Sequence, residues 1–326
     1  MLIGSQPALS VAMICDRDSR HFRLAVERLR RQTVAGEIEL ILITPSRGLL
    51  KLTSSDLSGF CSCQIVETGP FLSEGAAKAN GVRAARAPLI VFCENHSYPA
   101  PNWAETLVRR HQEAEYAVVG PLMSNANPTT LASWGCFLIF YGPYAAPVDP
   151  DKLRDLPGNN SAYRRDLLLE LGERLPDCLQ AESLLHRQWT QGGKRLCQAT
   201  ECRAWHMNPS HTWPAIVEYF FASRVFAHYR AAGWGPARRL LYFLAGPGLP
   251  FIRTGRAFGH ARRAGLPPGL AFRSLVPAFA ILCAGTAGEW LGTLLGEGRA
   301  AKLLMKFGSG REGIYTTEDL EAVERL

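Results

Sequence analysis

The chain has 326 residues, of which 47% are hydrophobic and 20% are charged, so it can bury one large core or two modest ones. Its nine cysteines are scattered and include no CxxC pair, so neither a disulfide framework nor a structural zinc site is indicated. The first residues lack a basic segment followed by an apolar core, so we expect no signal peptide and reduced thiols in the cytosol.

The net charge of +7 is unevenly distributed along the sequence. From Tyr219 to Gly288 there is no Asp or Glu, whereas the same stretch contains many arginines. This asymmetry predicts an anionic partner for the C-terminal part of the chain. Nucleic acid is a poor candidate, because the sequence shows no pairing of aromatic and basic residues suited to a groove.

The first part of the chain alternates between strands and helices. Leu9 to Cys15 is predicted to be a strand, and Asp18 or Ser19 can cap the helix that follows it. Ile38 to Ile43 is a second apolar strand, so the three elements form a βαβ unit with parallel strands. Gln64 to Glu67 is predicted to be a short third strand.

The next elements surround one fully apolar run. Ser73 to Ala87 is predicted to be a helix of small residues that packs closely on a sheet. Leu89 to Cys93 follows and is typical of a strand that is buried on both faces. Pro101 is expected in the first turn of a helix, and Tyr116 to Gly120 is expected to be another strand.

The remaining elements before residue 212 are less distinct. Residues 129–141 are apolar and aromatic without a clear period, and residues 156–161 form a turn-rich loop. The further predictions are a helix that ends at Gly172, a helix from Cys178 to Gln191 and two short strands over residues 194–198 and 203–206.

Two polar side chains, Glu94 and His96, directly follow the buried strand. Residues two apart in an extended chain point the same way, and ligands bind at the carboxyl ends of strands in open α/β sheets. A carboxylate and an imidazole suit Mn²⁺ or Mg²⁺, with a diphosphate filling the remaining positions. A solvated loop is the alternative interpretation of this short motif.

The order of these elements resembles the family 2 glycosyltransferases of the GT-A fold, over roughly residues 8–230. The resemblance implies an α/β fold with a mixed sheet flanked by helices, and an enzyme that uses a nucleotide-sugar. The segments that match the family's motifs are Cys15 to Arg17, Arg31-Gln32, Ala77 to Ala85, Phe92 to His96, Pro101 to Trp103, Gly158 to Arg165, Glu182 to Arg187 with Gly192, and His206.

The resemblance also implies roles for individual residues. Glu94, His96 and His206 would hold the metal ion, although His206 could instead be a capped loop histidine. Glu182 would be the catalytic base with Asp177 in reserve, although Glu182 could be an ordinary helix-surface carboxylate. The residues implied in binding the nucleotide-sugar are Cys15, Asp16, Arg17, Ser46, Lys78, Asn80 and Asn95. A solvated lysine on a helix is the alternative for Lys78.

Three features depart from the family's pattern. The second strand ends at Thr44-Pro45-Ser46, without the usual aspartates that bind base and ribose. The imidazole of His96 replaces a carboxylate, which removes a negative charge and makes metal loading depend more on the diphosphate. The usual Glu-Asp pair near Glu182 is not intact. These departures keep open a second hypothesis, a catalytically degenerate protein of this fold that binds nucleotide or glycan for a partner.

We expect two domains, a glycosyltransferase domain over residues 1–212 and a basic, apolar helical region over residues 213–326. Leu240 to Ile252 is too short to span a bilayer, whereas Leu275 to Leu295 is long enough. Pro277 and Glu289 weaken the case for a span, so a re-entrant or interfacial hairpin is favoured. A helical subdomain that packs on the sheet or forms a homodimer is the alternative.

The sequence therefore predicts a metal-dependent, inverting glycosyltransferase of hexosyltransferase type. Its partners would be a nucleotide-sugar donor, a lipid-linked or cell-surface polysaccharide acceptor and an anionic membrane surface, without nucleic acid. The expected location is the cytoplasmic face of the cell membrane, where lipid headgroups attract nearby arginines.

Overall fold

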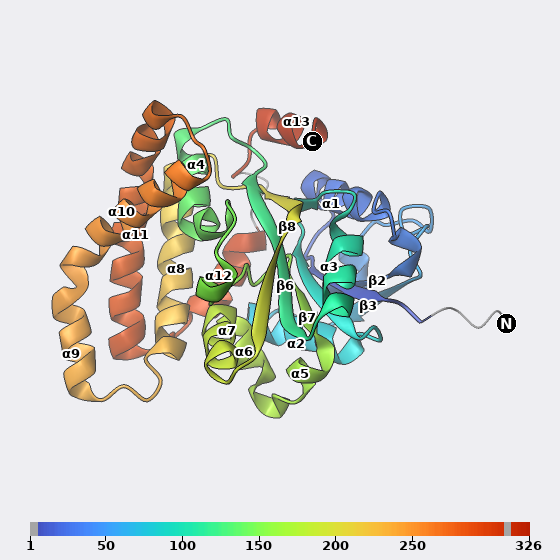
Figure 1. The fold of residues 1–326 in the computed structure, drawn as a ribbon, viewed down its shortest axis with the longest axis horizontal. Helices are drawn as coiled ribbons and strands as arrows, with labels where there is room; N and C mark the ends of the chain where they lie inside the picture. Colours follow the sequence, from blue (N-terminus) through green and yellow to red (C-terminus); the bar gives the residue numbers. More distant parts are fainter. Residues whose placement is uncertain (1–5, 310–313) are drawn as a thin grey trace. The chain divides into compact units, whose positions relative to one another are not determined.

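The computed structural model describes residues 6–309 and 314–326 of the chain, which divides into two compact units (Figure 1). The sheet unit comprises residues 1–123 and 147–206, and the helical unit comprises residues 124–146 and 207–326. The helical unit thus includes residues 124–146, which the predicted division after residue 212 assigned to the first domain.

The sheet has eight strands in the order β3-β2-β1-β4-β7-β6-β8-β5. The first four in sequence are parallel, as the βαβ pattern predicts, and they are β1 (Leu9–Ile14), β2 (Ile38–Thr44), β3 (Ser62–Glu67) and β4 (Leu89–Glu94). The predicted fold class is confirmed, because a mixed sheet is flanked by helices and followed by a C-terminal helical part.

The antiparallel part of the sheet begins next to β4. Strand β7 (Ala162–Arg164) runs antiparallel to β4 and to β6 (Tyr116–Asn125). Strand β5 (Ser97–Pro99) pairs antiparallel with β8 (Arg195–His206). The prediction of two short strands was wrong here, because β8 runs unbroken through residues 199–202, which lie between them in the sequence.

Helices α1 (Arg20–Arg30), α2 (Glu74–Ala84) and α3 (Trp103–Glu113) connect the strands of the sheet unit. Ser19 caps α1 by accepting from the backbone N–H of Phe22, which decides between the two predicted caps. Pro101 is not in the first turn of α3 as predicted, because Asn102 is the N-cap and Pro101 precedes it. Small residues on α2 pack on Ala12, Ile41 and Ile43 of the sheet.

Three short helices follow β7, namely α5 (Arg165–Leu169), α6 (Leu175–Gln180) and α7 (Glu182–Gln191). The single helix predicted from Cys178 to Gln191 is interrupted at Ala181, whose φ of −145° and ψ of 59° are not helical. Gly172 has a φ of +56°, which favours glycine and stops the preceding helix near the predicted place.

The helical unit contains α4 (Leu131–Phe140), α8 (Thr212–Arg230), α9 (Pro236–Ala245), α10 (Leu249–Arg263), α11 (Pro268–Leu295), α12 (Ala300–Ser309) and α13 (Thr317–Glu324). Helix α11 packs against α8, α10 and α4. It is also the one helix of the described residues that is long and apolar enough to cross a membrane, and 44% of its most apolar window is buried. Residues 129–141 contain α4. They showed no clear period in the sequence because this helix is apolar on most of its faces.

A buried carboxylate near the C-terminal end joins the two segments of the helical unit. Asp319 of α13 is fully buried and accepts hydrogen bonds from Ser210 Oγ at 2.6 Å, Thr129 Oγ1 at 2.8 Å and Asn127 Nδ2 at 3.1 Å. It also accepts from the backbone N–H of Thr316 at 2.7 Å. Asp319 thus holds segments of the helical unit that are far apart in the sequence.

Candidate active site

The carboxyl edge of the parallel strands carries the first candidate side chain. Residues 89–93 of β4 are buried, and Glu94 is the last residue of that strand, next to Ile14 of β1. Cys15, Asp16 and Arg17 follow β1, and Ser46 follows β2. Since β1 lies between β2 and β4 with all three parallel, these residues share one edge of the sheet with Glu94.

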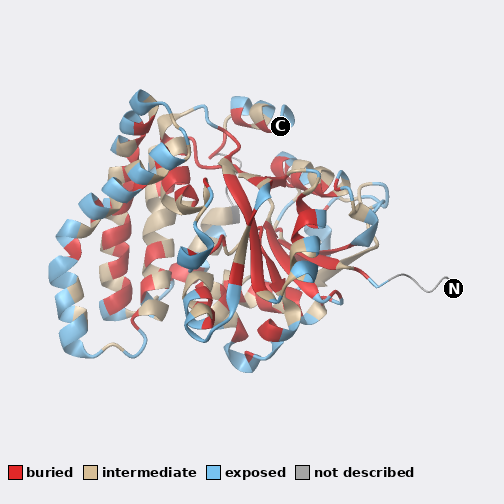
Figure 2. Ribbon diagram, in the orientation of Figure 1, coloured by how far each residue is buried: buried red, intermediate tan, exposed pale blue. Residues whose placement is uncertain are grey.

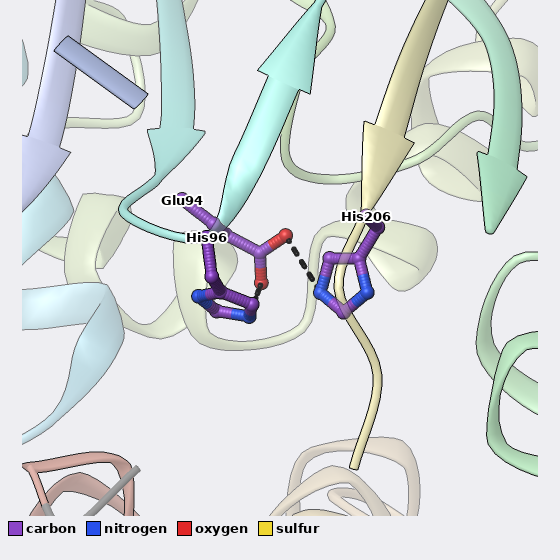
Figure 3. Close-up of side chains that lie close together, drawn as sticks. All are labelled: Glu94, His96 and His206. Atoms are coloured by element: carbon purple, nitrogen blue, oxygen red, sulfur yellow. Dashed lines mark ion pairs between the residues drawn. The ribbon is translucent and has the colours of Figure 1, made fainter. Parts of the chain in front are cut away.

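The pairing of two short segments brings His206 to the same place. His96 precedes β5, and Ser97 of β5 lies opposite His206, the last residue of β8. The Glu94 Oε2 atom is 3.4 Å from His206 Nε2, and Glu94 Oε1 is 3.9 Å from His96 Nε2 (Figure 3). The two imidazole rings lie edge to face with their centroids 4.7 Å apart.

These three residues form a cluster that fits a divalent cation. Each offers one ligand atom, and the three atoms lie within 4.8 Å of one another. His96 and His206 are buried, whereas the Glu94 side chain is 20% exposed. One carboxylate oxygen and two imidazole nitrogens make a donor set that Mn²⁺ and related transition ions accept. The three predicted metal ligands are therefore brought together by the fold.

Asn95 orients one of the two imidazoles. Its Oδ1 atom is 2.8 Å from His96 Nδ1. An amide oxygen can only accept, so Nδ1 donates and the lone pair is at Nε2, the atom that faces Glu94. Asn95 was predicted to bind the nucleotide-sugar, and its contact with His96 shows how it can prepare a metal ligand.

Asn160 supports the cluster from the loop before β7. Its Nδ2 donates to Ser97 Oγ at 3.2 Å, and Ser97 Oγ donates to Glu94 Oε2 at 3.4 Å. Its backbone N–H donates to Phe92 O at 2.7 Å, and its carbonyl accepts from Trp103 Nε1 at 3.1 Å. Three segments that carried the family resemblance thus meet at one buried residue. Asn160 has a φ of +66°, a conformation that Asn adopts more readily than most residues.

A second group of charges lies around Lys78 of α2. The Lys78 side chain is 4% exposed, and its ammonium contacts the carboxylate of Glu182 and, at 2.7 Å, that of Glu74. Burial alone would lower the pKa of the ammonium, but the two carboxylates outweigh burial and raise that pKa. Lys78 therefore stays charged and is held between two acids, and its predicted contact with phosphate remains a prediction.

Glu182, the predicted base, begins α7 next to the loop that contains Gly158. A Cβ at Gly158 would lie 2.9 Å from Glu182 Oε2, so the loop approaches the carboxylate as closely as only glycine allows. Burial raises the pKa of the Glu182 carboxyl group, against the attraction of Lys78. A raised pKa is a property of carboxylates that exchange protons near neutral pH.

The loop over Glu182 is also tied to α7 one turn later. His186 Nδ1 is 2.7 Å from Asp155 Oδ1, and His186 Nε2 is 2.9 Å from the hydroxyl of Tyr163. Tyr163 in turn donates to the carbonyl of Gly158 at 3.0 Å. Sequence reasoning missed His186, although its place four residues after Glu182 puts both on one face of a helix.

The other predicted residues occupy different settings. Asp177 is exposed on α6, and Asn80 is half-buried on α2. Cys15 is fully buried, with its thiol near the carbonyl oxygens of Met13 and Ile43, and burial raises the pKa of that thiol. Asp16 pairs with Arg17 at 3.9 Å. Ser46 is exposed after β2.

Residues 70–172 match the family model of glycosyl transferase family 2. The predicted resemblance to this family is therefore confirmed over that segment, which contains Glu94, His96 and Asn160. No curated protein sequence matches the chain.

Solved structures with a similar course of the chain include three glycosyltransferases. TarS of S. aureus is 12% identical with a TM-score of 0.44, over 67% of this chain and 39% of that one. GalNAc-T7 with UDP, GalNAc and Mn²⁺ is 15% identical with a TM-score of 0.46, over 61% and 43%. Mannosyltransferase PcManGT of Pyrobaculum calidifontis, with GDP-Man and Mn²⁺, is 14% identical with a TM-score of 0.46, over 98% and 86%. The matched part is about two fifths of the length of the first two.

Proposed function

We propose that the protein transfers a sugar from a nucleotide-sugar donor to a lipid-linked or cell-surface polysaccharide acceptor, with inversion at the anomeric carbon. The observation that carries the proposal is the convergence of Glu94, His96 and His206 beside a segment that matches the glycosyltransferase family. A divalent cation held by these residues would stabilise the negative charge on the leaving diphosphate.

In this proposal Glu182 takes the proton from the acceptor hydroxyl, with Asp177 as the alternative base. The raised pKa of Glu182 and its position under the Gly158 loop favour Glu182. Asp177 is exposed on α6, where a carboxylate is an ordinary surface group. Glu182→Gln should therefore abolish transfer while Asp177→Asn leaves it largely intact.

The two imidazoles favour Mn²⁺ over Mg²⁺, because Mg²⁺ prefers oxygen ligands. We place the reaction at the cytoplasmic face of the cell membrane, where an acid-free, arginine-rich segment meets anionic lipid and a lipid-linked acceptor is at hand. A homodimer is the alternative use of the apolar helical part.

The test is release of nucleoside diphosphate by the purified protein with Mn²⁺, a panel of nucleotide-sugars and a lipid extract. We expect release with one donor class, its loss in His96→Ala and its retention in His211→Ala, which alters an exposed histidine. Release by the wild-type protein with every metal omitted and chelator present would contradict the metal dependence.

A second candidate is a degenerate protein of this fold that binds nucleotide or glycan for a partner enzyme. The absence of acidic residues after β2 in the sequence Thr44-Pro45-Ser46 favours it. Calorimetry separates the two candidates, because the degenerate protein would bind a nucleoside diphosphate with Mn²⁺ yet turn over no donor. Binding without turnover across the whole panel would contradict the enzyme.

A further inference from the structure

Among residues 6–309 and 314–326, α11 is the one helix that is both long and apolar enough to span a bilayer, and it is a central element of the helical unit. A Cβ at Gly288 of α11 would lie 2.2 Å from the carbonyl oxygen of Phe220, and one at Gly292 would lie 2.1 Å from that of Arg224. Helix α11 therefore packs on α8 at a distance that only glycine permits. These close contacts tie α11 to α8 within the helical unit.

A buried carboxylate fixes α11 to three further elements. Glu289 is 4% exposed, and its Oε1 is 2.8 Å from Arg253 Nη1 of α10 while its Oε2 is 3.1 Å from Arg230 Nη2 of α8. The hydroxyl of Tyr242 in α9 also donates to this carboxylate. A lone span through hydrocarbon would have to leave these partners behind, which is costly for a charged group. Helix α11 thus stays within the protein.

The outer helices nevertheless expose large apolar side chains. Among the described residues of α9 none is buried, and α9 and α10 present extensive exposed surface (Figure 2). The ring of Phe251 in α10 packs at a tilt on Phe279 of α11, with ring centroids 5.1 Å apart, so the two helices touch beside their exposed residues. The exposed apolar side chains of these three helices include Leu240, Leu241, Leu244, Phe251, Ile252, Phe272 and Val276.

The charges beside these apolar residues are of one sign. Arg256, Arg262 and Arg263 of α10 and Arg273 of α11 are exposed, and no acidic residue occurs between Tyr219 and Gly288. Arg273 has no hydrogen-bond or ion-pair partner within residues 6–309 and 314–326. Exposed leucine and phenylalanine beside arginine are typical of helices that lie in the headgroup plane of a membrane.

A shallow apolar groove continues this surface. Its volume is about 460 Å³, and it is lined by Leu131, Ala132, Thr212, Pro277 and Ala280, with Val276 and Arg273 shared with the exposed face. An apolar groove with one guanidinium group is complementary to a lipid chain below an anionic headgroup.

We propose that the helical unit binds an anionic bilayer in the interfacial plane, through α9, α10 and the start of α11, without a transmembrane span. This membrane-binding face consists of the exposed apolar residues and arginines named above. The proposal deepens the proposed function by naming the surface that brings the protein to a lipid-linked acceptor. It concerns binding alone, so its test does not depend on sugar transfer.

The test is flotation of the full-length protein with vesicles of phosphatidylcholine, alone or mixed with phosphatidylglycerol. We expect binding to the anionic vesicles only, weakened by salt because surface charges are screened. Leu241→Ser/Leu244→Ser/Phe251→Ser and Arg256→Gln/Arg262→Gln/Arg263→Gln should each weaken binding about tenfold or more. Leu72→Ser is the matched control, since Leu72 is 74% exposed in the sheet unit.

All three variants change exposed side chains, so each should keep the melting temperature of the wild-type protein. The melting temperatures are measured before the flotation. Wild-type protein that stays with neither kind of vesicle would overturn the proposal. Equal loss of binding in Leu72→Ser would also overturn it. So would a dimer, detected by light scattering, that dissociates in the triple leucine and phenylalanine variant, because the face would then belong to a second copy of the chain.

Discussion

Ser97 and His206 lie directly opposite one another in the antiparallel pairing of β5 with β8. Since His96 precedes Ser97 and Glu94 ends β4, this one pair of residues places two imidazoles beside a carboxylate. A shift of one residue in the register of β5 would turn alternate side chains to the other face. The geometry of the candidate metal cluster thus depends on a strand of only three residues.

Removing His206 should weaken metal binding. Loss of a direct ligand leaves one carboxylate and one imidazole, and we expect His206→Ala to lower Mn²⁺ affinity by about tenfold or more, as loss of even an outer-sphere partner does. Electron paramagnetic resonance of free Mn²⁺ during a titration measures the change. His211→Ala is the control, and equal affinities of the two variants would refute the cluster.

Asn95 should act through His96. Asn95→Ala removes the acceptor that holds Nδ1 protonated, so we expect Mn²⁺ affinity to fall ~10–100-fold, the range for outer-sphere partners. Asn95→Asp keeps an acceptor oxygen and should retain most of the affinity. A titration in which Asn95→Ala matches the wild-type protein would show that the contact has no role in binding.

The charges around Lys78 should be coupled. Lys78→Met leaves the Glu182 carboxylate buried without its cation, and we expect a loss of about 3 kcal/mol in the free energy of unfolding. Lys78→Met/Glu182→Gln should recover part of that loss, which urea denaturation of the four proteins in the cycle measures.

The sign of the pH dependence follows from the direction of the Glu182 shift. Burial raises the pKa of the Glu182 carboxyl group in the folded state. The contribution of Glu182 to the free energy of unfolding is therefore most favourable below its unfolded pKa, and it is lost as pH rises through the folded pKa. The deficit of Lys78→Met should therefore be larger at neutral pH than at about pH 5. A deficit that grows on acidification would contradict this account.

The close packing of α11 on α8 should not tolerate a methyl group. Gly288→Ala places a Cβ against the carbonyl of Phe220, and we expect a loss of about 1–3 kcal/mol in stability from overpacking. Gly255→Ala on α10 meets nothing within 4 Å and should instead stabilise by about 0.5–1 kcal/mol through helix propensity. Thermal unfolding of both variants checks the pair, and the same sign for both would count against the packing.

Asp319 should stabilise the helical unit in a pH-dependent way. Burial alone would raise its pKa, but hydrogen bonds from Ser210, Thr316 and Thr129 outweigh burial and lower the pKa. The contribution of Asp319 to the free energy of unfolding is therefore present above its unfolded pKa of about 3.9, and it is lost as pH falls through the folded pKa. We expect Asp319→Asn to cost about 3 kcal/mol at neutral pH and less on acidification. Chemical denaturation across that range measures it, and a pH-independent deficit would exclude the carboxylate's charge as the cause.

Much of the sheet could be predicted because its strands are continuous apolar runs. Leu89 to Cys93 can only be buried, and the alternation of strands with helices implies parallel pairing. Strand β8 was predicted in two pieces, and it is continuous in the structure through Glu201, which lies between them. The break between α6 and α7 at Ala181 could not be predicted either, because alanine does not favour the non-helical backbone angles found there.

The candidate site could be predicted in part. Glu94 and His96 follow a buried strand, and His206 came from its place in the order of motifs. The support from Ser97 and Asn160 could not be read from the sequence, because it depends on a left-handed residue and on pairing between distant segments. The pairing of Lys78 with Glu182 joins residues 104 positions apart and carries no local pattern.

The hydrogen bonds of Asp319 have a consequence for biosynthesis. A nascent chain that has left the ribosome only as far as Phe307 already carries Asn127, Thr129 and Ser210, but not the carboxylate to which all three donate. The segment that follows His206 therefore acquires its final anchor only after α13 has been translated. Elongation past Asp319 therefore supplies the last hydrogen bonds that hold these segments together.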